Sequence, residues 1–333
     1  MRYLVTGHTG FKGSWLSLWL HRKGHEVVGV ALDPLPGALY DLARVSDTIA
    51  RDVRMDIRDG DGLVEVLQSV QPDVVVHLAA QPLVRESYRD PVTTFTTNVD
   101  GTMNVLRSLQ GIESLRAALI ITTDKVYRNV DQIWGYKETD PLGGDDPYSA
   151  SKAMADLLTQ SWSKSFDGPP VAIARAGNVI GGGDVSPDRL LPDLIGAYSV
   201  GRRPVLRYPS AVRPWQHVLD CLNGYMTLVE AMLNDRRTGA WNFGPDVDGF
   251  RTVGEVNTLV AGLFGQRAGY DLSADEPDEA NLLALDARKA QIRLGWRNRL
   301  RFEEAVRWTV EWHQRVSRGE DPNETTMGQI DGY

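Results

Sequence analysis

Apolar and mixed segments alternate through the first half of the chain. Five short apolar runs predict buried strands, at residues 3–6, 26–32, 73–78, 117–123 and 171–175. Three longer amphipathic segments predict helices, at residues 12–23, 62–70 and 90–109. Strands and helices that alternate at this spacing indicate βαβ units. The sequence therefore predicts an α/β fold with a doubly wound parallel sheet and helices on both of its faces.

The pattern changes after residue 176. Three consecutive glycines at 181–183 end the regular alternation, and residues 186–215 are rich in Pro and Arg. Later segments predict a helix at 222–233, a late strand at 241–243, a clear helix at 302–316 and a loose polar tail after 318. Two domains follow: a cofactor domain at 1–176, to which 213–243 returns, and a smaller, mostly helical C-terminal substrate lobe at 177–212 and 244–333.

Composition and charge narrow the class of protein. The 333 residues are 42% hydrophobic and carry a formal net charge of −8, which disfavours nucleic acid as a partner. Cys221 is the single cysteine, so no internal disulfide can form, as suits a reducing compartment. No leader and no apolar run of membrane-spanning length are seen. We expect a cytoplasmic protein without membrane association or a metal site.

A glycine turn follows the first predicted strand. Gly7, Gly10 and Gly13 permit a tight turn and a close backbone approach, and the next helix would offer free N–H groups to a pyrophosphate. An ordinary glycine turn is the alternative, but the position between a strand and a helix favours a dinucleotide site. Asp33 ends the second strand, where a carboxylate binds an adenosine ribose and repels a 2′-phosphate, so NAD is favoured over NADP.

The spacing of these glycines resembles that of the extended short-chain dehydrogenase/reductase superfamily, whose fold is of the Rossmann type. The resemblance implies further cofactor contacts beyond Asp33. These are Thr9, Phe11 and Lys12 in the glycine turn, Asp56 and Ile57 at the adenine, Leu78, Ala79 and Ala80 as a small-residue wall, and Asn98 and Thr122. His77, which precedes the wall, is expected to be a packed strand-end residue.

Tyr148 and Lys152 are four residues apart and would project from one face of a helix. A lysine ammonium beside a phenol favours the phenolate, which can act as a base near neutral pH. Together with Thr123, which ends a strand, they resemble the Ser/Thr–Tyr–Lys site of the superfamily. We therefore predict that this trio removes a hydroxyl proton while a hydride passes to NAD, with Tyr148 and Lys152 also contacting the cofactor.

The two residues after Thr123 indicate which reaction the site performs. An acid and a base follow the Thr in the sugar-nucleotide 4,6-dehydratases, and Asp124 matches the acid, whereas Lys125 departs from the usual Glu. Thr-Asp-Lys resembles the CDP-glucose 4,6-dehydratases in particular. Long strings carry this resemblance, at residues 7–16, 80–85, 87–88, 143–148, 175–184, 213–218 and 241–245. Val126, Val185 and Asp278 depart from the family pattern, so the base and sugar stay open.

The resemblance also implies a nucleoside diphosphate sugar as substrate, with CDP-glucose favoured. Arginine suits its phosphates, and five arginines lie between 189 and 213, of which Arg202 and Arg203 are better read as solvated. The predicted substrate contacts are Gln81, Ser87, Asn178, Arg189, Leu190, Tyr208 and Arg213. Trp215 is an alternative to Tyr208 beside the base, and either aromatic residue is as readily part of the core.

We therefore predict a hydro-lyase in which Tyr148 is the base at O4, Asp124 the acid at O6 and Lys125 the group at C5. Lys125 removes the C5 proton only if it is neutral; as an ammonium it would stabilise the enolate, and another group such as Glu138 would be the base. Two alternative functions are a nucleotide-sugar 4-epimerase, which needs no acid–base pair, and a non-catalytic NAD-binding sensor or scaffold.

The superfamily resemblance finally implies a homodimer that pairs through two helices of each subunit. The candidate helices are residues 94–109 and 151–166. Their apolar residues are Val99, Met103, Leu106, Met154, Leu158 and Trp162, and the alternative is that these face the sheet.

Overall fold

A seven-stranded parallel sheet forms the centre of the molecule, as the alternating pattern predicted. The computed structural model describes residues 1–273 and 282–333. The strand order is β10-β6-β5-β4-β1-β2-β3, and all neighbours are parallel. The strands are β1 (Arg2–Thr6), β2 (Glu26–Ala31), β3 (Arg51–Arg54), β4 (Val74–His77), β5 (Ala117–Thr123), β6 (Val171–Ala176) and β10 (Gly239–Phe243). The order reverses between β1 and β4, where such sheets bind ligands beyond the strand ends.

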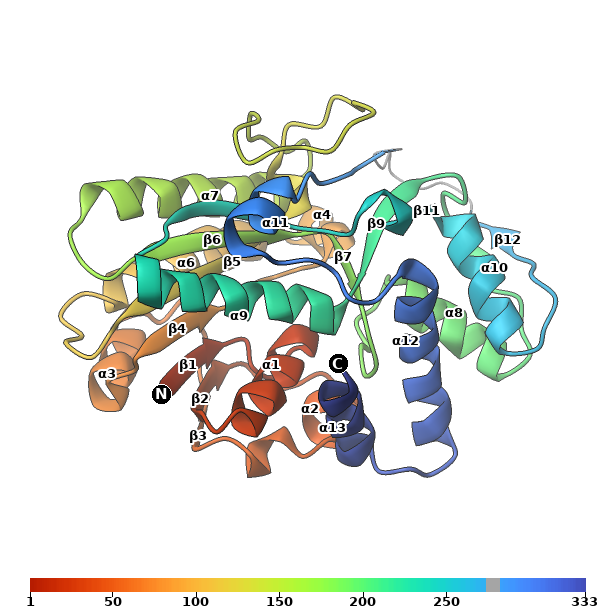
Figure 1. Cartoon of the computed structure of the whole chain (residues 1–333), viewed down its shortest axis with the longest axis horizontal. Helices are drawn as coiled ribbons and strands as arrows, with labels where there is room; N and C mark the ends of the chain where they lie inside the picture. Colours follow the sequence, from red (N-terminus) through yellow and green to blue (C-terminus); the bar gives the residue numbers. More distant parts are fainter. Residues whose placement is uncertain (274–281) are drawn as a thin grey trace.

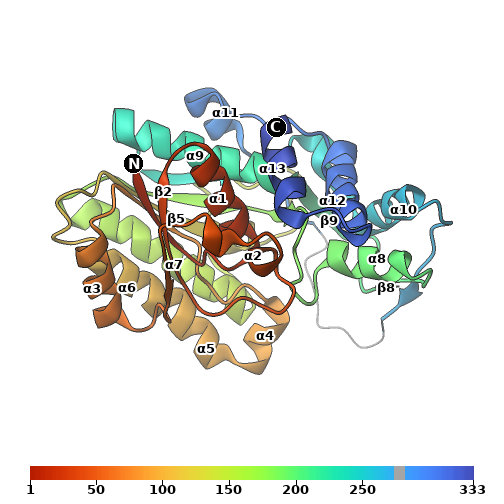
Figure 2. The same cartoon turned by 90° about the horizontal axis from the view of Figure 1, so that it is seen from below.

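Helices cover both faces of this sheet (Figures 1 and 2), so the predicted Rossmann-type doubly wound architecture is confirmed. One face carries α1 (Phe11–Arg22) and α9 (Val218–Asp235), and their apolar side chains share a core with alternate strand residues. The other face carries α3 (Gly60–Val70), α6 (Gly101–Ser108) and α7 (Pro147–Ser165). Both faces of the strands are therefore buried, which explains their nearly continuous apolar sequences.

Two elements of the sheet domain differ from the prediction. The edge strand β3 has the sequence Arg-Asp-Val-Arg. It was not predicted because three of its four residues are charged. The segment predicted as one helix at 90–109 is α5 (Pro91–Phe95), a π-helical turn (Thr96–Asp100) and α6. The late strand at 241–243 is confirmed as part of β10, which pairs with β6.

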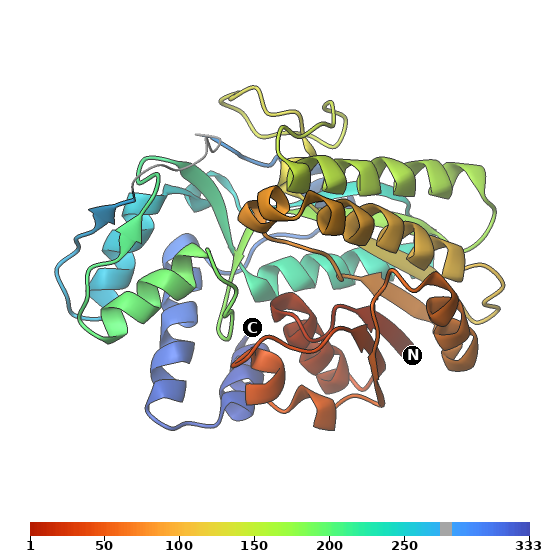
Figure 3. The ribbon, with the colours of Figure 1, turned by 180° about the vertical axis from the view of Figure 1, so that it is seen from behind.

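A smaller lobe lies beside the sheet domain and is seen from behind in Figure 3. It contains a sheet of order β11-β9-β7 and a strand pair β12-β8, packed with helices around their own apolar core. Its elements are β7 (Asn178–Ile180), α8 (Leu190–Ser199), β8 (Val205–Leu206), β9 (Val212–His217), β11 (Phe250–Thr252), α10 (Val253–Leu263), β12 (Asp271–Leu272) and α12 (Phe302–Ser317).

The glycines at 181–183 join the lobe to the sheet domain. Trp15 Nε1 of α1 donates a hydrogen bond to Gly182 O over 2.9 Å. A Cβ on Gly182 would lie 2.1 Å from Cγ of Trp312 on α12, so only glycine permits this close contact. The remaining helices are α2 (Leu39–Leu42), α4 (Val84–Arg89), α11 (Arg288–Leu294) and α13 (Pro322–Gly332).

The prediction of a loose tail after residue 318 is wrong. Residues Pro322–Gly332 form α13, which lies beside α1 and α2 (Figure 2). Asn323 Nδ2 donates to Ala43 O over 2.6 Å, and Asp331 accepts two hydrogen bonds from Arg22. The segment is polar because it docks through hydrogen bonds and a few buried side chains. Within the described residues, no helix is long and apolar enough to cross a membrane.

Candidate active site

The glycine turn lies at the carboxyl end of β1, and two of its glycines have no room for a side chain. Gly7 has a φ of +75°, and a Cβ there would lie 2.6 Å from Ala79 N. A Cβ on Gly13 would lie 2.1 Å from Gly7 O, so side chains are excluded at both positions. Gly10 precedes α1, and among the described residues no side chain caps this helix. Its first N–H groups are thus available to a pyrophosphate.

The residues predicted for the adenosine end surround the ends of β2 and β3. Thr9 Oγ1 donates to Leu32 O over 3.0 Å and ties the turn to β2. The Asp33 carboxylate is 90% exposed and lies 3.9 Å from Arg54 Nη1. Asp56 pairs with Arg58 over 2.6 Å, and these hydrogen bonds lower the pKa of Asp56. Ile57 is buried in the core and is covered by Gly101.

Five further predicted cofactor residues differ in what surrounds their side chains. Leu78, Ala79 and Ala80 are half-buried at the end of β4, as a wall beside a ligand requires. Asn98 instead uses its amide within the protein, accepting from Gln81 N over 2.9 Å and donating to Ser151 Oγ over 2.9 Å. The Thr122 hydroxyl donates to Asp156 over 3.0 Å.

His77 is a packed residue, as expected. Its ring nitrogens lie 2.7 Å and 3.1 Å from the hydroxyls of Thr6 and Thr102, and burial lowers its pKa to about 3.

Thr123, Tyr148 and Lys152 come together from β5 and the first turns of α7. Asp146 caps this helix by accepting from Ser149 N, and Pro147 starts it, so the local sequence fixes where Tyr148 stands. All three side chains are buried. Lys152 Nζ donates to Ile121 O over 2.8 Å. Burial and the Lys12 ammonium lower the pKa of Lys152 to about 8, and Asp156 opposes this shift.

Lys152 was expected to lower the pKa of Tyr148 toward neutral pH, but the pKa is raised. Burial raises the pKa of Tyr148 to about 12, and Asp124 and Asp146 also raise it. The Thr123 side chain and the charge of Arg189 lower it, but desolvation of the phenolate dominates because Tyr148 is only 8% exposed. Arg189, predicted as a phosphate ligand, therefore also acts on the phenol.

Asp124 and Lys125 begin a 3-10 turn (Asp124–Val126) at the end of β5. Asp124 is buried, and its Oδ1 accepts from the Thr123 hydroxyl over 2.9 Å. Its Oδ2 is buried with no hydrogen-bond partner among the described residues. Buried polar atoms normally have partners, so this oxygen is available to a ligand group. Lys125 is half-buried, and its N–H donates to Thr123 Oγ1 over 3.4 Å.

This arrangement agrees with the comparison to known proteins. The sequence model described as "GDP-mannose 4,6 dehydratase" matches residues 4–309. The chain belongs to this dehydratase family. A CDP-glucose 4,6-dehydratase of Salmonella typhimurium is 40% identical to it over 344 aligned residues, which cover 100% of this chain and 96% of that protein.

Solved structures show the same fold as this dehydratase-family chain. DesIV, a dTDP-glucose 4,6-dehydratase of Streptomyces venezuelae solved with NAD and TYD, is 27% identical with a TM-score of 0.85, covering 97% of this chain and 100% of its own. A UDP-glucose 4-epimerase of Stenotrophomonas maltophila with bound NAD has the same TM-score at 24% identity, covering 96% and 100%. At that identity the likeness shows the fold alone, so it gives the epimerase alternative no added support.

The predicted substrate residues of this family member divide into two groups. The Gln81 side-chain amide is hydrogen-bonded to Leu83 and Thr94. Ser87 is fully buried, and its hydroxyl donates to Val84 O. Neither side chain can reach a sugar without rearranging. The others lie in the lobe. Asn178 starts β7, Arg189 and Leu190 begin α8, Tyr208 follows β8, and Arg213 is buried in β9. Val185 is 38% exposed, and Asp278 lies outside the described residues.

Two features of the site were missed in the sequence. Lys12 Nζ donates to Tyr225 OH of α9 over 3.3 Å, and burial lowers the pKa of Lys12. Asp156 and Arg175 form a buried ion pair behind the catalytic residues. A signal for the pair existed: Asp156 follows Lys152 by one helical turn, and Arg175 interrupts an apolar strand.

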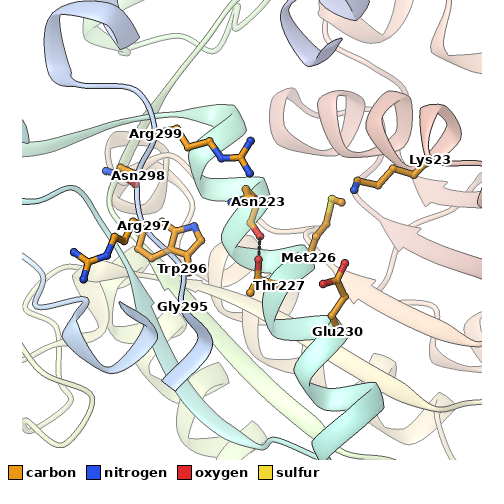
Figure 4. A pocket seen from close by; sticks show the side chains of 10 residues that line it. All are labelled: Lys23, Asn223, Met226, Thr227, Glu230, Gly295, Trp296, Arg297, Asn298 and Arg299. Carbon is orange, nitrogen blue, oxygen red and sulfur yellow. Dashed lines mark hydrogen bonds between the residues drawn. The ribbon is translucent and has the colours of Figure 1, made fainter. Parts of the chain in front are cut away.

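A pocket of about 450 Å³ lies between α9 and residues 295–299 (Figure 4). None of its lining residues is a predicted site residue; they include Lys23, Asn223, Glu230 and Arg299. The side chain of Glu138, the alternative base, is bonded to β10. Its Oε1 accepts from Asn242 N over 2.8 Å, and within the described chain no hydrogen bond joins it to residues 123–125.

Proposed function

We propose that the chain is an NAD-dependent CDP-glucose 4,6-dehydratase, a hydro-lyase that converts CDP-glucose to CDP-4-keto-6-deoxyglucose. One observation carries the reaction type: a buried carboxylate with an unpartnered oxygen, Asp124 Oδ2, lies in the turn that follows Thr123. A 4-epimerase needs no such acid. The 40% identity to a CDP-glucose 4,6-dehydratase supports cytosine as the base of the nucleotide substrate.

The residues at the carboxyl ends of β1 and β2 fit NAD. The glycine turn leaves room for a pyrophosphate, and Asp33 offers an exposed carboxylate to the adenosine ribose. These residues would hold NAD⁺, whose chemistry would be to accept a hydride from C4 of the sugar and to return it to C6, with the cofactor regenerated in each turnover. Thr9, Phe11, Lys12, Asp56, Ile57 and Leu78–Ala80 complete the proposed binding surface, with Asn98 and Thr122 supporting it from behind.

The chain's own groups move the protons. Tyr148 accepts the C4 hydroxyl proton. Burial raises the pKa of its phenol to about 12, and the Thr123 side chain and the charge of Arg189 oppose this rise. The resulting 4-keto group acidifies the C5–H bond. Lys125 acts at C5 and Asp124 donates a proton to the leaving O6 hydroxyl, so water is lost across C5 and C6. We prefer Lys125 to Glu138 as the C5 base because the Glu138 carboxylate accepts a hydrogen bond from Asn242 N of β10.

The smaller lobe, built on the β11-β9-β7 sheet with α8, α10 and α12, is assigned to the sugar nucleotide. Arg189 and Arg213 are the proposed phosphate ligands, with Asn178 beside them, Leu190 adjacent and Tyr208 near the base. We also assign the enzyme to the cytoplasm, as the single buried Cys221 suits, and to a homodimer.

The test is incubation of the protein and NAD⁺ with CDP-, dTDP-, UDP- and GDP-glucose. We expect a 4-keto-6-deoxy product from CDP-glucose, with the Tyr148→Phe variant as the inactive control. If only another nucleotide sugar gives product, the assignment of cytosine as the nucleobase is wrong. A 4-epimer formed without loss of water would replace the dehydratase by an epimerase.

A further inference from the structure

An ion pair between α7 and β6 is fully buried. Arg175 Nε and Nη2 donate to Asp156 Oδ2 and Oδ1 over 2.8 and 2.7 Å, and both side chains are 0% exposed. Asp156 also accepts from Thr122 Oγ1 over 3.0 Å and from Gln160 Nε2 over 2.7 Å. Desolvation offsets most of the attraction in such pairs, so stability alone is a weak explanation for it.

The same pair is bonded to both flanks of the catalytic turn at 123–125. Thr122, whose hydroxyl donates to Asp156, directly precedes Thr123. On the other flank, two residues after Lys125, Tyr127 OH accepts from Arg175 Nη1 over 2.8 Å and donates to Asn242 Oδ1 over 2.7 Å. The 123–125 turn is therefore enclosed between two hydroxyl groups that are held by one ion pair.

We propose that the Asp156–Arg175 pair positions the 123–125 turn from both of its ends, so that Asp124 and Lys125 meet C6 and C5 of the substrate. This inference rests on the proposed dehydratase activity. Asp156, Arg175, Thr122 and Tyr127 are positioning residues, since they act through the turn.

The turn needs this support because most of it lies outside the sheet. Thr123 still pairs with Ala176 of β6, but Asp124 and Lys125 extend beyond the strand. Inside the turn, the Lys125 N–H makes only a long 3.4 Å bond to Thr123 Oγ1. A displacement of about 1 Å can reduce a rate 100-fold. Elimination should therefore depend on the ion pair more strongly than C4 oxidation, whose base Tyr148 is fixed on α7.

Tyr127→Phe removes one flank contact and keeps the ring. Tyr136→Phe is the matched control: its ring stacks on Tyr127 with centroids 5.2 Å apart, but its hydroxyl bonds to Asn129 and Val130 of the outer loop. In single turnovers with CDP-glucose we expect Tyr127→Phe to slow water loss at least tenfold and to accumulate NADH, seen by its absorbance. C4 oxidation and the affinity for CDP-glucose should change less than twofold, and the control should behave as wild type.

Thr122→Val tests the other flank with a side chain of the same shape. The same accumulation of NADH is expected, and the affinity for NAD⁺ is measured separately because Thr122 supports the cofactor surface. Thermal melting of all three variants checks that they fold. Equal slowing of oxidation and elimination, or no slowing of either, would overturn the positioning role while leaving the dehydratase intact. A wild-type protein that forms no 4-keto product would instead refute the activity itself, and this inference with it.

Discussion

In the proposed mechanism, oxidation at C4 depends on the phenol of Tyr148. Tyr148→Phe keeps the buried ring, so the fold and NAD binding should be preserved while the proton acceptor is lost. Removal of a general base typically costs about 10²–10⁴ in rate. We expect transient NADH formation with CDP-glucose to fall by about that factor. Stopped-flow absorbance with the purified variant measures it, and turnover close to that of wild type would contradict the mechanism.

In the proposed mechanism Lys125 acts after oxidation, so its removal should separate the two steps. Lys125→Met should still reduce NAD⁺ with substrate but stall before water leaves, with about 100-fold slower elimination and suppressed solvent-deuterium exchange at C5. Lys137→Met on the following loop is the matched control, because Lys137 is an exposed lysine. Normal elimination in Lys125→Met would show that the C5 base lies elsewhere.

Spacing along the sequence predicted the residues whose contacts are local. Tyr148 and Lys152 share a helix face, and the three glycines share one turn, so both groups were found without knowledge of the fold. Gln81 and Ser87 were placed less well, because their hydrogen bonds depend on how the segment after β4 turns. Asp156 and Arg175 were missed because they are 19 residues apart on different elements.

At the scale of elements, the start of α9 binds two later segments of the chain, residues 299–300 and the C-terminal Tyr333. Asp220 accepts from the N–H groups of Arg299 and Leu300, and from the hydroxyl of Tyr333 over 2.8 Å. Burial raises the pKa of Asp220 to about 6, against the lowering effect of these hydrogen bonds. The native protein therefore holds this proton more tightly than the unfolded chain.

A raised carboxyl pKa gives a definite pH dependence of stability. The contribution of protonated Asp220 is complete below its unfolded pKa of about 3.9 and is lost as the pH rises through about 6, at most about 3 kcal/mol. Asp220→Asn should remove this slope, so its melting temperature relative to wild type should be more favourable at pH 7.5 than at pH 5. Melting curves of this variant and of exposed Asp235→Asn, which should keep the wild-type slope, provide the check.

Strands with a continuous apolar run were predicted with nearly correct ends, since burial on both faces makes nearly every residue apolar. The runs at 117–123 and 26–32 are β5 and β2 almost to the residue. Polar elements were not predicted. Asp52 of β3 pairs with His8, and α13 bonds to Arg22 and Ala43, so both elements are held by polar contacts with distant residues, which no periodicity indicates.

For the whole molecule, α6 and α7 present the surface proposed for dimerisation. Met103 and Met154, two of the expected interface residues, are 40% and 47% exposed, and Leu157, which was not expected there, is 54% exposed. Three other expected residues, Leu106, Leu158 and Trp162, pack in or against the core. Met154→Glu combined with Leu157→Glu should weaken a dimer at least tenfold, about 1.4 kcal/mol. Sedimentation equilibrium measures this, with exposed Ile292→Glu on α11 as the control. A wild-type monomer at micromolar concentration would refute the dimer.

The path of the chain couples the lobe and the sheet domain. It leaves the sheet after β6, returns for α9 and β10, enters the lobe again, and ends with α13 against α1. Neither part is a continuous segment, and Trp312 of α12 lies under Gly182 in the core shared with the sheet. Denaturant should therefore melt the protein in one cooperative transition. Intrinsic tryptophan fluorescence and far-ultraviolet circular dichroism should report the same midpoint, and no protease cut should release a folded half.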